Sequence, residues 1–386
     1  MPEGGNWKDL FKAAEEGDVP KTRYHLAGGV DPNWQHPEYF TAPIHEAIKN
    51  GHLEIVKILV EEGGAKPGLM EELTDDTTID IARANLQFEI LEYLNTKVPQ
   101  ELRFDSRVVL VTEGLVGTGK ILALELLMKG HEVFFVASSE EEALKASEEL
   151  RQESGNSKIG YIIGKLDTIH DVYQLAKTVQ QQIPKLNTLV QNACIWPFSR
   201  QTNDDGLESS FMVNYMARCI LNQELGKLLE ESNTPCIIYV NPEAKWREPD
   251  LIDTPKGANY SWFKSISETI ACSTNSFLNC VQKMKGSGVT VVLVQAGKLH
   301  NSIDKESSGC YWPLVEIAQT VFPDAPSVTS AITWLVEEGE GGDFHGKIYS
   351  ADREEVTNYT VMSIPKEWDQ WTTDFLSRSR SSTPVS

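Results

Sequence analysis

Positive charge is scarce in this sequence. Its 386 residues include 35 Lys and Arg against 56 Asp and Glu, which gives a formal net charge of −21. Binding to nucleic acid requires clustered cations that replace the counterions of the phosphates. The composition therefore argues against a nucleic-acid partner, and the acidic balance favours solubility.

Cysteine pairs, long apolar runs and a leader are also missing. The six cysteines are scattered with no C-x-x-C, so neither a zinc site nor a redox motif is indicated and we expect no metal site. No apolar run approaches the roughly 20 residues that span a bilayer. The N-terminal MPEGGNWKDL has neither the basic nor the apolar part of a signal peptide. We therefore expect a reduced, cytoplasmic protein with no membrane span.

A repeat occupies the first hundred residues. The segments "AAEEGDV" from Ala13, "AIKNGHL" from Ala47 and "ARANLQF" from Ala82 recur at intervals of 34 and 35 residues. Ahead of the second copy lies "TAPIHEA", residues 41–47, which resembles the ankyrin pattern T-P-L-H-x-A.

The ankyrin resemblance implies about three helical repeats over residues 6–97, followed by a linker at 98–107. Thr41 and His45 have the side chains that bond a turn to the start of its helix. Ankyrin arrays bind protein partners through a concave face, so we expect a protein partner there. The alternative is that so short an array only packs against its neighbour.

From Val108 onward, short apolar runs alternate with amphipathic stretches. This alternation predicts a parallel sheet with helices on both faces. In such sheets, ligands bind beyond the carboxyl ends of the strands. The expected strands are Val108–Val111, Val133–Val136, Ile159–Ile163, Thr188–Val190, Ile237–Val240, Val289–Val294 and Lys347–Tyr349.

The turn "TEGLVGTGK", residues 112–120, follows the first expected strand and has two interpretations. One is the glycine-rich turn of a dinucleotide fold that lacks one glycine. The other is a phosphate-binding loop of a nucleotide hydrolase, Gly114-x4-Gly119-Lys120, with Ile121 where Ser or Thr should hold magnesium.

Later segments decide between these interpretations, because they resemble the short-chain dehydrogenase/reductase family, in particular its retinol-dehydrogenase and WW-domain-oxidoreductase branch. They cover residues 104–352 in the family's order and spacing. A phosphate-binding loop explains none of them. They are "VVLVTEGLVGTGK", "LDTIHDV", "KLNTLVQNAC", "DDGLESSFMVNYMARCILNQEL", "CIIYVNP", "KMKGSGVTVVLVQAG" and "HGKIYSAD".

The resemblance implies an NAD(P) site at these strand ends. The family turn T-G-x-x-x-G-x-G has Glu113 in place of its first glycine, and an anion there repels a pyrophosphate by on the order of 1 kcal/mol or more. Cys194 replaces the glycine of the family motif N-N-A-G. The sequence indicates no preference between NAD and NADP. The implied cofactor positions are Thr112, Gly114, Gly117, Gly119, Ser138, Asp167, Asn192 and Ala193.

The family transfers hydride between a nicotinamide and a carbonyl or alcohol, using Asn, Ser, Tyr and Lys for acid–base catalysis. Asn214 matches the Asn, whereas Pro242 lies at the Ser position. Counting back without gaps from "GSGVTVVLVQAG" puts Ile266 at the Tyr position and Ile270 at the Lys position. Neither isoleucine titrates or donates a hydrogen bond.

A shifted register would restore both groups through Tyr260 and Lys264 of "YSWFK". It requires six inserted residues before the next strand, which is not a whole number of helical turns. An apolar face instead predicts an unbroken helix over roughly Ser261–Lys285 and favours the isoleucine register. That face consists of Phe263, Ile266, Ile270, Phe277, Val281 and Met284.

The sequence therefore predicts an α/β protein, in which a doubly wound parallel-sheet Rossmann domain at 108–355 follows a small all-α ankyrin-repeat domain. The preferred interpretation is a pseudoenzyme that acts as a protein-interaction scaffold or weak NAD(P)-binding sensor. The alternative is an active NAD(P)-dependent carbonyl/alcohol oxidoreductase using Tyr260 and Lys264. A homodimer through the 261–285 helix is a further hypothesis. The tail at 356–386 is expected to form a short amphipathic helix and a disordered end from Arg378.

Overall fold

The computed structural model describes residues 7–115, 117–243, 249–250, 253–298, 325–338, 343–357 and 367–382. The chain divides into two compact units. The first consists of Met1–Ser106 with Leu127–Gly130 and Arg151–Ser157, and the second contains the other residues. No helix among the described residues is long and apolar enough to cross a membrane.

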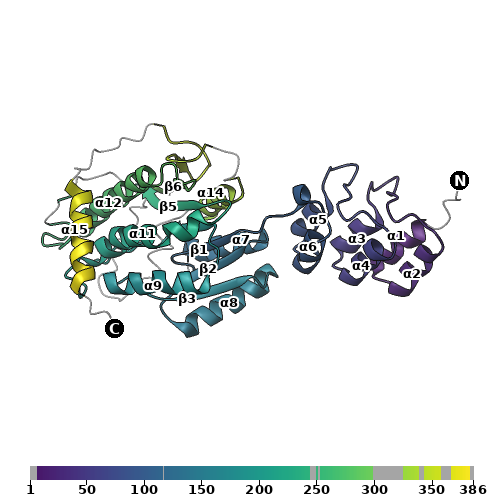
Figure 1. Cartoon of the computed structure of the whole chain (residues 1–386), viewed down its shortest axis with the longest axis horizontal. Coiled ribbons are helices and arrows are strands. Elements are labelled where there is room, and N and C mark those ends of the chain that lie inside the picture. Colours follow the sequence, from purple (N-terminus) through teal and green to yellow (C-terminus); the bar gives the residue numbers. More distant parts are fainter. Residues whose placement is uncertain are drawn as a thin grey trace, which may run out of the picture. The chain divides into compact units, whose positions relative to one another are not determined.

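The first unit contains three helix pairs, as the repeat predicts (Figure 1). The equivalent residues Ala13, Ala47 and Ala82 are all buried. A methyl side chain lets neighbouring helices approach closely, which explains why alanine recurs there. The pairs are α1 (Trp7–Glu16) with α2 (Val19–Ala27), α3 (Pro43–Lys49) with α4 (Leu53–Glu61), and α5 (Thr78–Ala84) with α6 (Phe88–Asn95); the short helix η1 (Gln100–Leu102) follows.

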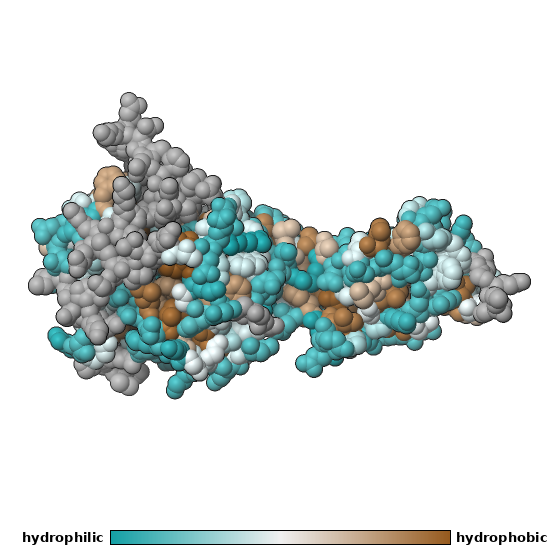
Figure 2. Space-filling model, turned by 90° about the horizontal axis from the view of Figure 1, so that it is seen from above, coloured by the Kyte–Doolittle hydropathy of each residue, from teal (hydrophilic) through white to brown (hydrophobic). Residues whose placement is uncertain are grey.

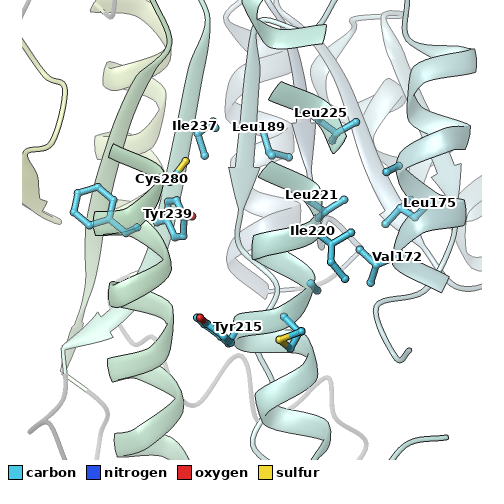
Figure 3. Close-up of a cluster of buried hydrophobic side chains, with 14 of the residues drawn as sticks. Val172, Leu175, Leu189, Tyr215, Ile220, Leu221, Leu225, Ile237, Tyr239 and Cys280 are labelled. Atoms are coloured by element: carbon cyan, nitrogen blue, oxygen red, sulfur yellow. The ribbon is translucent and has the colours of Figure 1, made fainter. Parts of the chain in front are cut away.

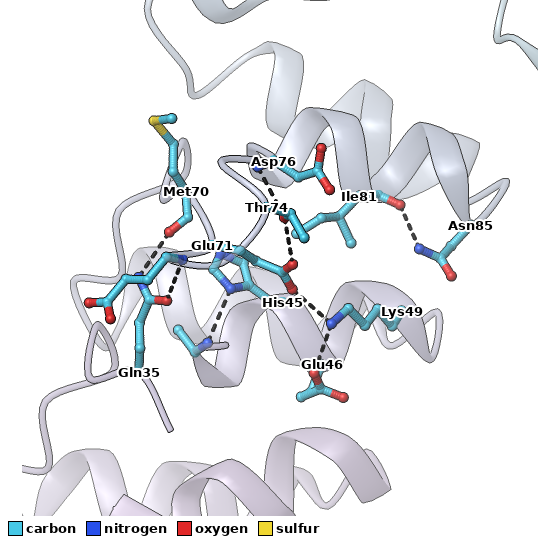
Figure 4. A network of polar contacts seen from close by, with 12 residues as sticks. Gln35, His45, Glu46, Lys49, Met70, Glu71, Thr74, Asp76, Ile81 and Asn85 are labelled. Atoms are coloured by element: carbon cyan, nitrogen blue, oxygen red, sulfur yellow. Dashed lines mark hydrogen bonds and ion pairs between the residues drawn. The ribbon is translucent and has the colours of Figure 1, made fainter. Parts of the chain in front are cut away.

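His45 joins a loop to the start of α3 (Figure 4). Its Nδ1 accepts a hydrogen bond from the Ala42 N–H at 3.1 Å, so Nε2 carries the proton and donates to the Leu69 carbonyl at 3.0 Å. Burial lowers the pKa of His45, which keeps the ring neutral. Thr41 does not share this role: its buried hydroxyl has no hydrogen-bond partner among the described residues, because His45 already satisfies the turn.

The second unit is built on seven parallel strands in the order β3-β2-β1-β4-β5-β6-β7. All seven strands expected from the sequence are confirmed, with ends that differ by a few residues. They are β1 (Val108–Val111), β2 (Glu132–Ala137), β3 (Ile159–Ile163), β4 (Thr188–Gln191), β5 (Cys236–Glu243), β6 (Thr290–Lys298) and β7 (Ile348–Ser350).

Helices cover both faces of the sheet (Figure 1), which a parallel sheet requires because its strands are apolar on both sides. One face carries α9 (Ile169–Gln182), α11 (Ala217–Glu230) and α12 (Trp262–Lys283). Figure 3 shows their apolar side chains meeting those of β4 and β5. The remaining helices are α7 (Gly117–Met128), α8 (Glu140–Ser154), α10 (Ser209–Phe211), the π-helical turn η2 (Met212–Met216) and α14 (Ala325–Glu338).

Helix α12 is unbroken, as its apolar pattern predicts. One residue of that pattern departs from it: the Phe263 side chain is 69% exposed, because it lies in the first turn, before the helix passes beneath the neighbouring elements.

The last helix, α15 (Glu367–Ser382), docks on its own domain. Trp368 is fully buried, with ring centroids 5.9 Å from those of Phe211 and Tyr215, and the Tyr215 hydroxyl bonds that of Thr372 at 2.8 Å. The predicted disorder from Arg378 is wrong for residues 378–382, which continue the docked helix, and residues 383–386 lie outside the described part.

A turn within each repeat suggests a stability test. Gly17 and Gly51 have φ of 73° and 74°, whereas the equivalent residue in the third repeat is Leu86 at φ 56°. A left-handed conformation costs a residue with a β carbon about 1 kcal/mol. We therefore expect Leu86→Gly to raise the free energy of unfolding by up to ~1 kcal/mol in chemical denaturation.

The matched control is Leu73→Gly, at an exposed residue whose φ is not positive. It should leave stability unchanged or lower it. Equal effects at both positions would contradict strain at Leu86.

Candidate functional site

The candidate site lies where the chain direction across the sheet reverses. β1 is followed along the chain by β2 on one side, and β4 pairs with it on the other. The connections after β1 and β4 leave in opposite directions, which opens the position where α/β sheets bind ligands. The cofactor residues expected from the sequence all follow strands at this edge, namely Thr112 and the glycines after β1, Ser138 after β2, Asp167 after β3, and Asn192 and Ala193 after β4.

The turn after β1 is held to the end of β4 by hydrogen bonds between side chains and backbone groups. The Thr112 hydroxyl oxygen accepts hydrogen bonds from the N–H groups of Asn192 and Ala193, both at 3.0 Å. The Asn192 amide donates to the Glu113 carbonyl at 3.2 Å. A β carbon on Gly119 would lie 1.8 Å from that same carbonyl oxygen. Glycine is therefore obligatory at Gly119, since any side chain would force the turn apart.

The other two glycines meet different demands. Gly117 begins α7 at φ 55°, a left-handed conformation that glycine adopts without strain. A β carbon on Gly114 would lie 2.4 Å from the Phe135 Cβ of β2. Each of these two positions therefore favours glycine, one for its backbone conformation and the other for its close approach to β2.

The Glu113 side chain turns toward the end of β4. Its carboxyl accepts a hydrogen bond from the Cys194 N–H, and burial raises its pKa to about 7. Burial, with a smaller contribution from Glu113, raises the pKa of the Cys194 thiol to about 12. The two residues that replace family glycines therefore contact each other at the candidate cofactor edge.

The cofactor residues on the outer strands are less enclosed. Ser138 and Asp167 are both exposed. The Asn203 amide donates a hydrogen bond to the Asp167 backbone carbonyl at 2.7 Å.

Arg218 is a buried cation for which the sequence analysis predicted no role. Its guanidinium donates to Asn241 Oδ1 and Ser273 Oγ at 2.7 Å, and to the carbonyls of Ala193 and Val240 at 3.1 Å. It thus ties the ends of β4 and β5 to α12. The available signal was one arginine inside the otherwise uncharged stretch "FMVNYMARCILNQ".

The expected catalytic positions lie on η2, α12 and β5, and one of them contacts the segment after β4. Asn214 lies in the π-helical turn η2, where it bonds the Ile195 N–H at 2.8 Å, the Ile195 carbonyl at 2.9 Å and Thr269 Oγ1 at 3.3 Å. Ile266 and Ile270 lie one turn apart on α12, at 5% and 3% exposure. Pro242 is buried near the end of β5.

Tyr260 and Lys264, the alternative pair, do not share a helical face. α12 begins at Trp262 with Ser261 as its N-cap, so Tyr260 precedes the helix. Its hydroxyl donates to the Pro197 carbonyl, and burial raises its pKa to about 12. The Lys264 ammonium pairs with Asp253 and lies 3.8 Å from Glu268.

Room beside this pair is small. Among the described residues, the hollow that Tyr260 and Lys264 line measures about 10 Å³. That volume accommodates about one water molecule.

Lys120 does not face the turn in the way a phosphate-binding lysine would. Its ammonium forms a 2.7 Å ion pair with Glu149 of α8. This pairing supports the dinucleotide-type interpretation of "TEGLVGTGK" over the phosphate-binding loop.

Comparison with known proteins supports both halves of this architecture. A family model described as short chain dehydrogenase matches residues 107–246, and a model for three copies of the ankyrin repeat matches residues 10–101. The chain therefore carries a short-chain dehydrogenase domain behind N-terminal ankyrin repeats. The predicted fold is confirmed.

Relatives of the short-chain dehydrogenase domain include human dehydrogenase/reductase SDR family member 12, which is 33% identical over 36% of this chain and 44% of its own length. Mouse retinol dehydrogenase 13 is 26% identical over 54% of this chain and 63% of its own length. The chain thus spans about half the length of these relatives. A solved metagenomic short-chain oxidoreductase in complex with NADP is 16% identical, with a TM-score of 0.44 over 61% of this chain and 93% of that one.

The carboxyl of Glu113 should make the stability of the short-chain dehydrogenase domain depend on pH. The folded pKa of about 7 lies above the ordinary 4.5, so the folded state binds more protons than the unfolded state between these values. The contribution of Glu113 to stability then falls as the pH rises from about 4.5 to 7. At about 1.4 kcal/mol for each pKa unit, this loss is at most about 3.5 kcal/mol.

Glu113→Gln removes this titration while keeping the side chain's size. We expect the free energy of unfolding of the variant to depend less on pH across this window than that of the parent, with the largest advantage above pH ~7. Glu149→Gln, at a partly exposed carboxylate on α8, is the control. Parallel pH profiles for parent and Glu113→Gln would contradict a protonated Glu113.

Proposed function

We propose that the short-chain dehydrogenase domain performs no hydride transfer, and that the chain acts as a protein-interaction scaffold with at most weak NAD(P) binding. The observation that carries the proposal is the buried pair Ile266 and Ile270 at the positions that the family resemblance gives to Tyr and Lys. Neither side chain can protonate a substrate oxygen or hold a nicotinamide ribose.

Loss of the serine position points the same way. Pro242 has no donor, and the neighbouring Asn241 is engaged: its Oδ1 accepts from Arg218 at 2.7 Å and Ser273 at 2.9 Å, and its Nδ2 bonds Thr274 at 3.3 Å. A substrate oxygen would have to displace one of these buried hydrogen bonds, which leaves a group unsatisfied at a cost of about 1–3 kcal/mol.

Tyr260 and Lys264 are poor substitutes. General acid catalysis by a tyrosine requires a pKa near the working pH, which a nearby lysine ammonium lowers. Here burial raises the pKa of Tyr260, and Lys264 is neutralised by Asp253. The tyrosine therefore holds its proton, and the lysine has no free charge to offer.

Residues that would hold NAD(P) are only partly suitable. The Thr112–Asn192 contacts and the glycines of the turn keep the backbone in place, and Asp167 stays accessible. Bound NAD(P) would supply the hydride, but Glu113 introduces an acid into the turn. Above pH ~7 its carboxylate repels a pyrophosphate by on the order of 1 kcal/mol or more, so we propose weak binding that improves as the pH falls.

A role in protein binding then rests on the ankyrin repeats. Such arrays use their loops and concave face to hold other proteins. The proposed scaffold would place a partner bound to the repeats on the same chain as the dehydrogenase-like domain.

The proposal is tested by cofactor consumption. With NADH or NADPH and a panel of aldehydes, ketones and retinoids, the absorbance of the reduced cofactor should not fall faster than with Tyr260→Phe. Titration calorimetry with all four nicotinamide nucleotides should give weak heats or none at pH 8, and stronger binding at pH 6 in the parent than in Glu113→Gln.

Steady oxidation of cofactor that disappears in Tyr260→Phe would overturn the proposal and establish the shifted-register oxidoreductase. Tight binding of one nucleotide without turnover would agree with the proposed loss of catalysis. It would contradict the proposal that NAD(P) binds only weakly.

A further inference from the structure

The ankyrin repeats expose an unusual set of large side chains on the two loops that join their helix pairs, residues 28–42 and 62–77. In Figure 1 these loops extend to one side of the helices, and Figure 2 views the chain from that side, where apolar and hydrophilic residues intermix. We call the set the loop surface. It consists of Trp34, Tyr39, Phe40, Met70 and Leu73, with exposed fractions of 52%, 60%, 37%, 46% and 71%.

Hydrogen bonds join the two loops to each other (Figure 4). The Gln35 amide donates to the Met70 carbonyl at 2.9 Å and accepts from the Glu72 N–H at 3.1 Å. The Glu72 N–H also approaches the Phe40 carbonyl at 3.3 Å. The loop surface is therefore formed before any partner binds, which reduces the entropy lost on binding.

Backbone strain supports the same conclusion. Phe40 and Asp75 adopt φ of 56° and 61°, although neither is glycine. Such conformations are strained and persist where the surroundings impose them. The Phe40 side chain nevertheless stays partly in solvent.

Ring packing holds the exposed aromatics in place. The Tyr39 ring lies 4.4 Å from that of His36 and stacks on Phe11 at 6.4 Å. The Trp34 ring lies 6.4 Å from that of Trp7. Trp34 and Tyr39 are thus each supported by a neighbouring ring while more than half of each residue stays exposed.

Negative charge surrounds these rings. The two loops contain seven acidic residues and one lysine, Lys66. Glu62 and Glu71 are paired with Arg23 and Lys49. The other five acidic residues of the two loops are exposed and form no ion pair among the described residues; they are Asp31, Glu38, Glu72, Asp75 and Asp76.

We propose that the loop surface binds a positively charged, partly apolar peptide segment of a partner protein. This inference rests on the proposed role of the repeats in partner binding. Lys or Arg side chains would lie against Trp34 and Tyr39, where the ring faces attract cations. Their charges would meet Glu38, Glu72, Asp75 and Asp76, and apolar side chains of the segment would cover Met70 and Leu73.

The same charges exclude a polyanion, since phosphates would face carboxylates without cations to replace their counterions. The attraction should weaken with added salt, because the carboxylates are exposed.

The test selects peptides on the intact chain from a displayed library of random sequences, without prior choice of charge. We expect enriched peptides to carry Lys or Arg beside Leu, Ile or an aromatic residue. The most enriched peptide is then synthesised with a fluorescent label, together with a counterpart in which Glu replaces every Lys and Arg. Fluorescence anisotropy measures the affinity of both.

Two sets of variants locate the site. Trp34→Ala with Tyr39→Ala should weaken binding at least tenfold, whereas Tyr24→Ala, an exposed tyrosine on α2, should not change it. Glu72→Gln with Asp75→Asn should weaken binding similarly. Glu54→Gln with Glu89→Gln, on the first turns of α4 and α6, is the matched charge control. All these side chains are exposed, so circular dichroism should confirm unchanged folding.

The outcomes separate the two proposals. Enriched peptides that depend on Trp34 and Tyr39 but are neutral or acidic overturn the inference while preserving partner binding by the repeats. Equal weakening by the Glu54 and Glu89 control would show unspecific attraction to an acidic protein and overturn it as well. No enrichment of any peptide would contradict the proposed scaffold role itself.

Discussion

The contact between the Gly119 backbone and the Glu113 carbonyl constrains the whole candidate site. Because a β carbon would lie 1.8 Å from that oxygen, the chain after β1 can turn into α7 only with glycine there. This turn positions two hydrogen-bond acceptors. The Glu113 carbonyl accepts from the Asn192 side-chain amide, and the Thr112 hydroxyl oxygen accepts from the N–H groups of Asn192 and Ala193 after β4. One steric requirement thus links the central strand, the following helix and the neighbouring strand end.

Retention of this geometry does not require retention of chemistry. The turn, the parallel sheet and Asn214 stabilise the fold, since their hydrogen bonds are made within the protein. In the proposed non-catalytic role, isoleucine and proline would occupy the Tyr, Lys and Ser positions without loss of folding, because those groups act on a ligand rather than on the fold. Buried Ile266 and Ile270 add apolar burial, and Arg218 fills the polar space between the ends of β4, β5 and α12.

The two units place their polar groups differently. In the dehydrogenase-like domain, buried polar groups near the ends of β4 and β5 bond one another, as Arg218 does with Asn241 and the Ala193 carbonyl. In the repeats, the helices supply a core of small and aliphatic residues, while the loops leave aromatic rings and carboxylates exposed. Rigid loops over a helical core are a common way to present a binding surface, because the scaffold bears the cost of ordering them.

Much of the architecture was determined by the sequence alone. The apolar runs and their spacing predicted all seven strands, and the repeat of buried alanines predicted three helix pairs, because burial periodicity is a local property of the chain. The unbroken α12 followed from its apolar face, although Phe263 proved exposed. Replacement of two glycines by Glu113 and Cys194 was also visible from motif position.

Tertiary structure decided what the individual polar groups do. The sequence could not show that Glu113 bonds the Cys194 N–H, or that Arg218 joins two strand ends to a helix. It also could not show that Tyr260 bonds the Pro197 carbonyl and that Lys264 pairs with Asp253. The sequence predicted that both Thr41 and His45 bond the turn to the start of its helix, but only His45 does so. It also predicted disorder at 378–382, where the last helix continues. These outcomes depend on partners far apart in the chain, and hydrogen bonding and burial are settled only when those partners meet.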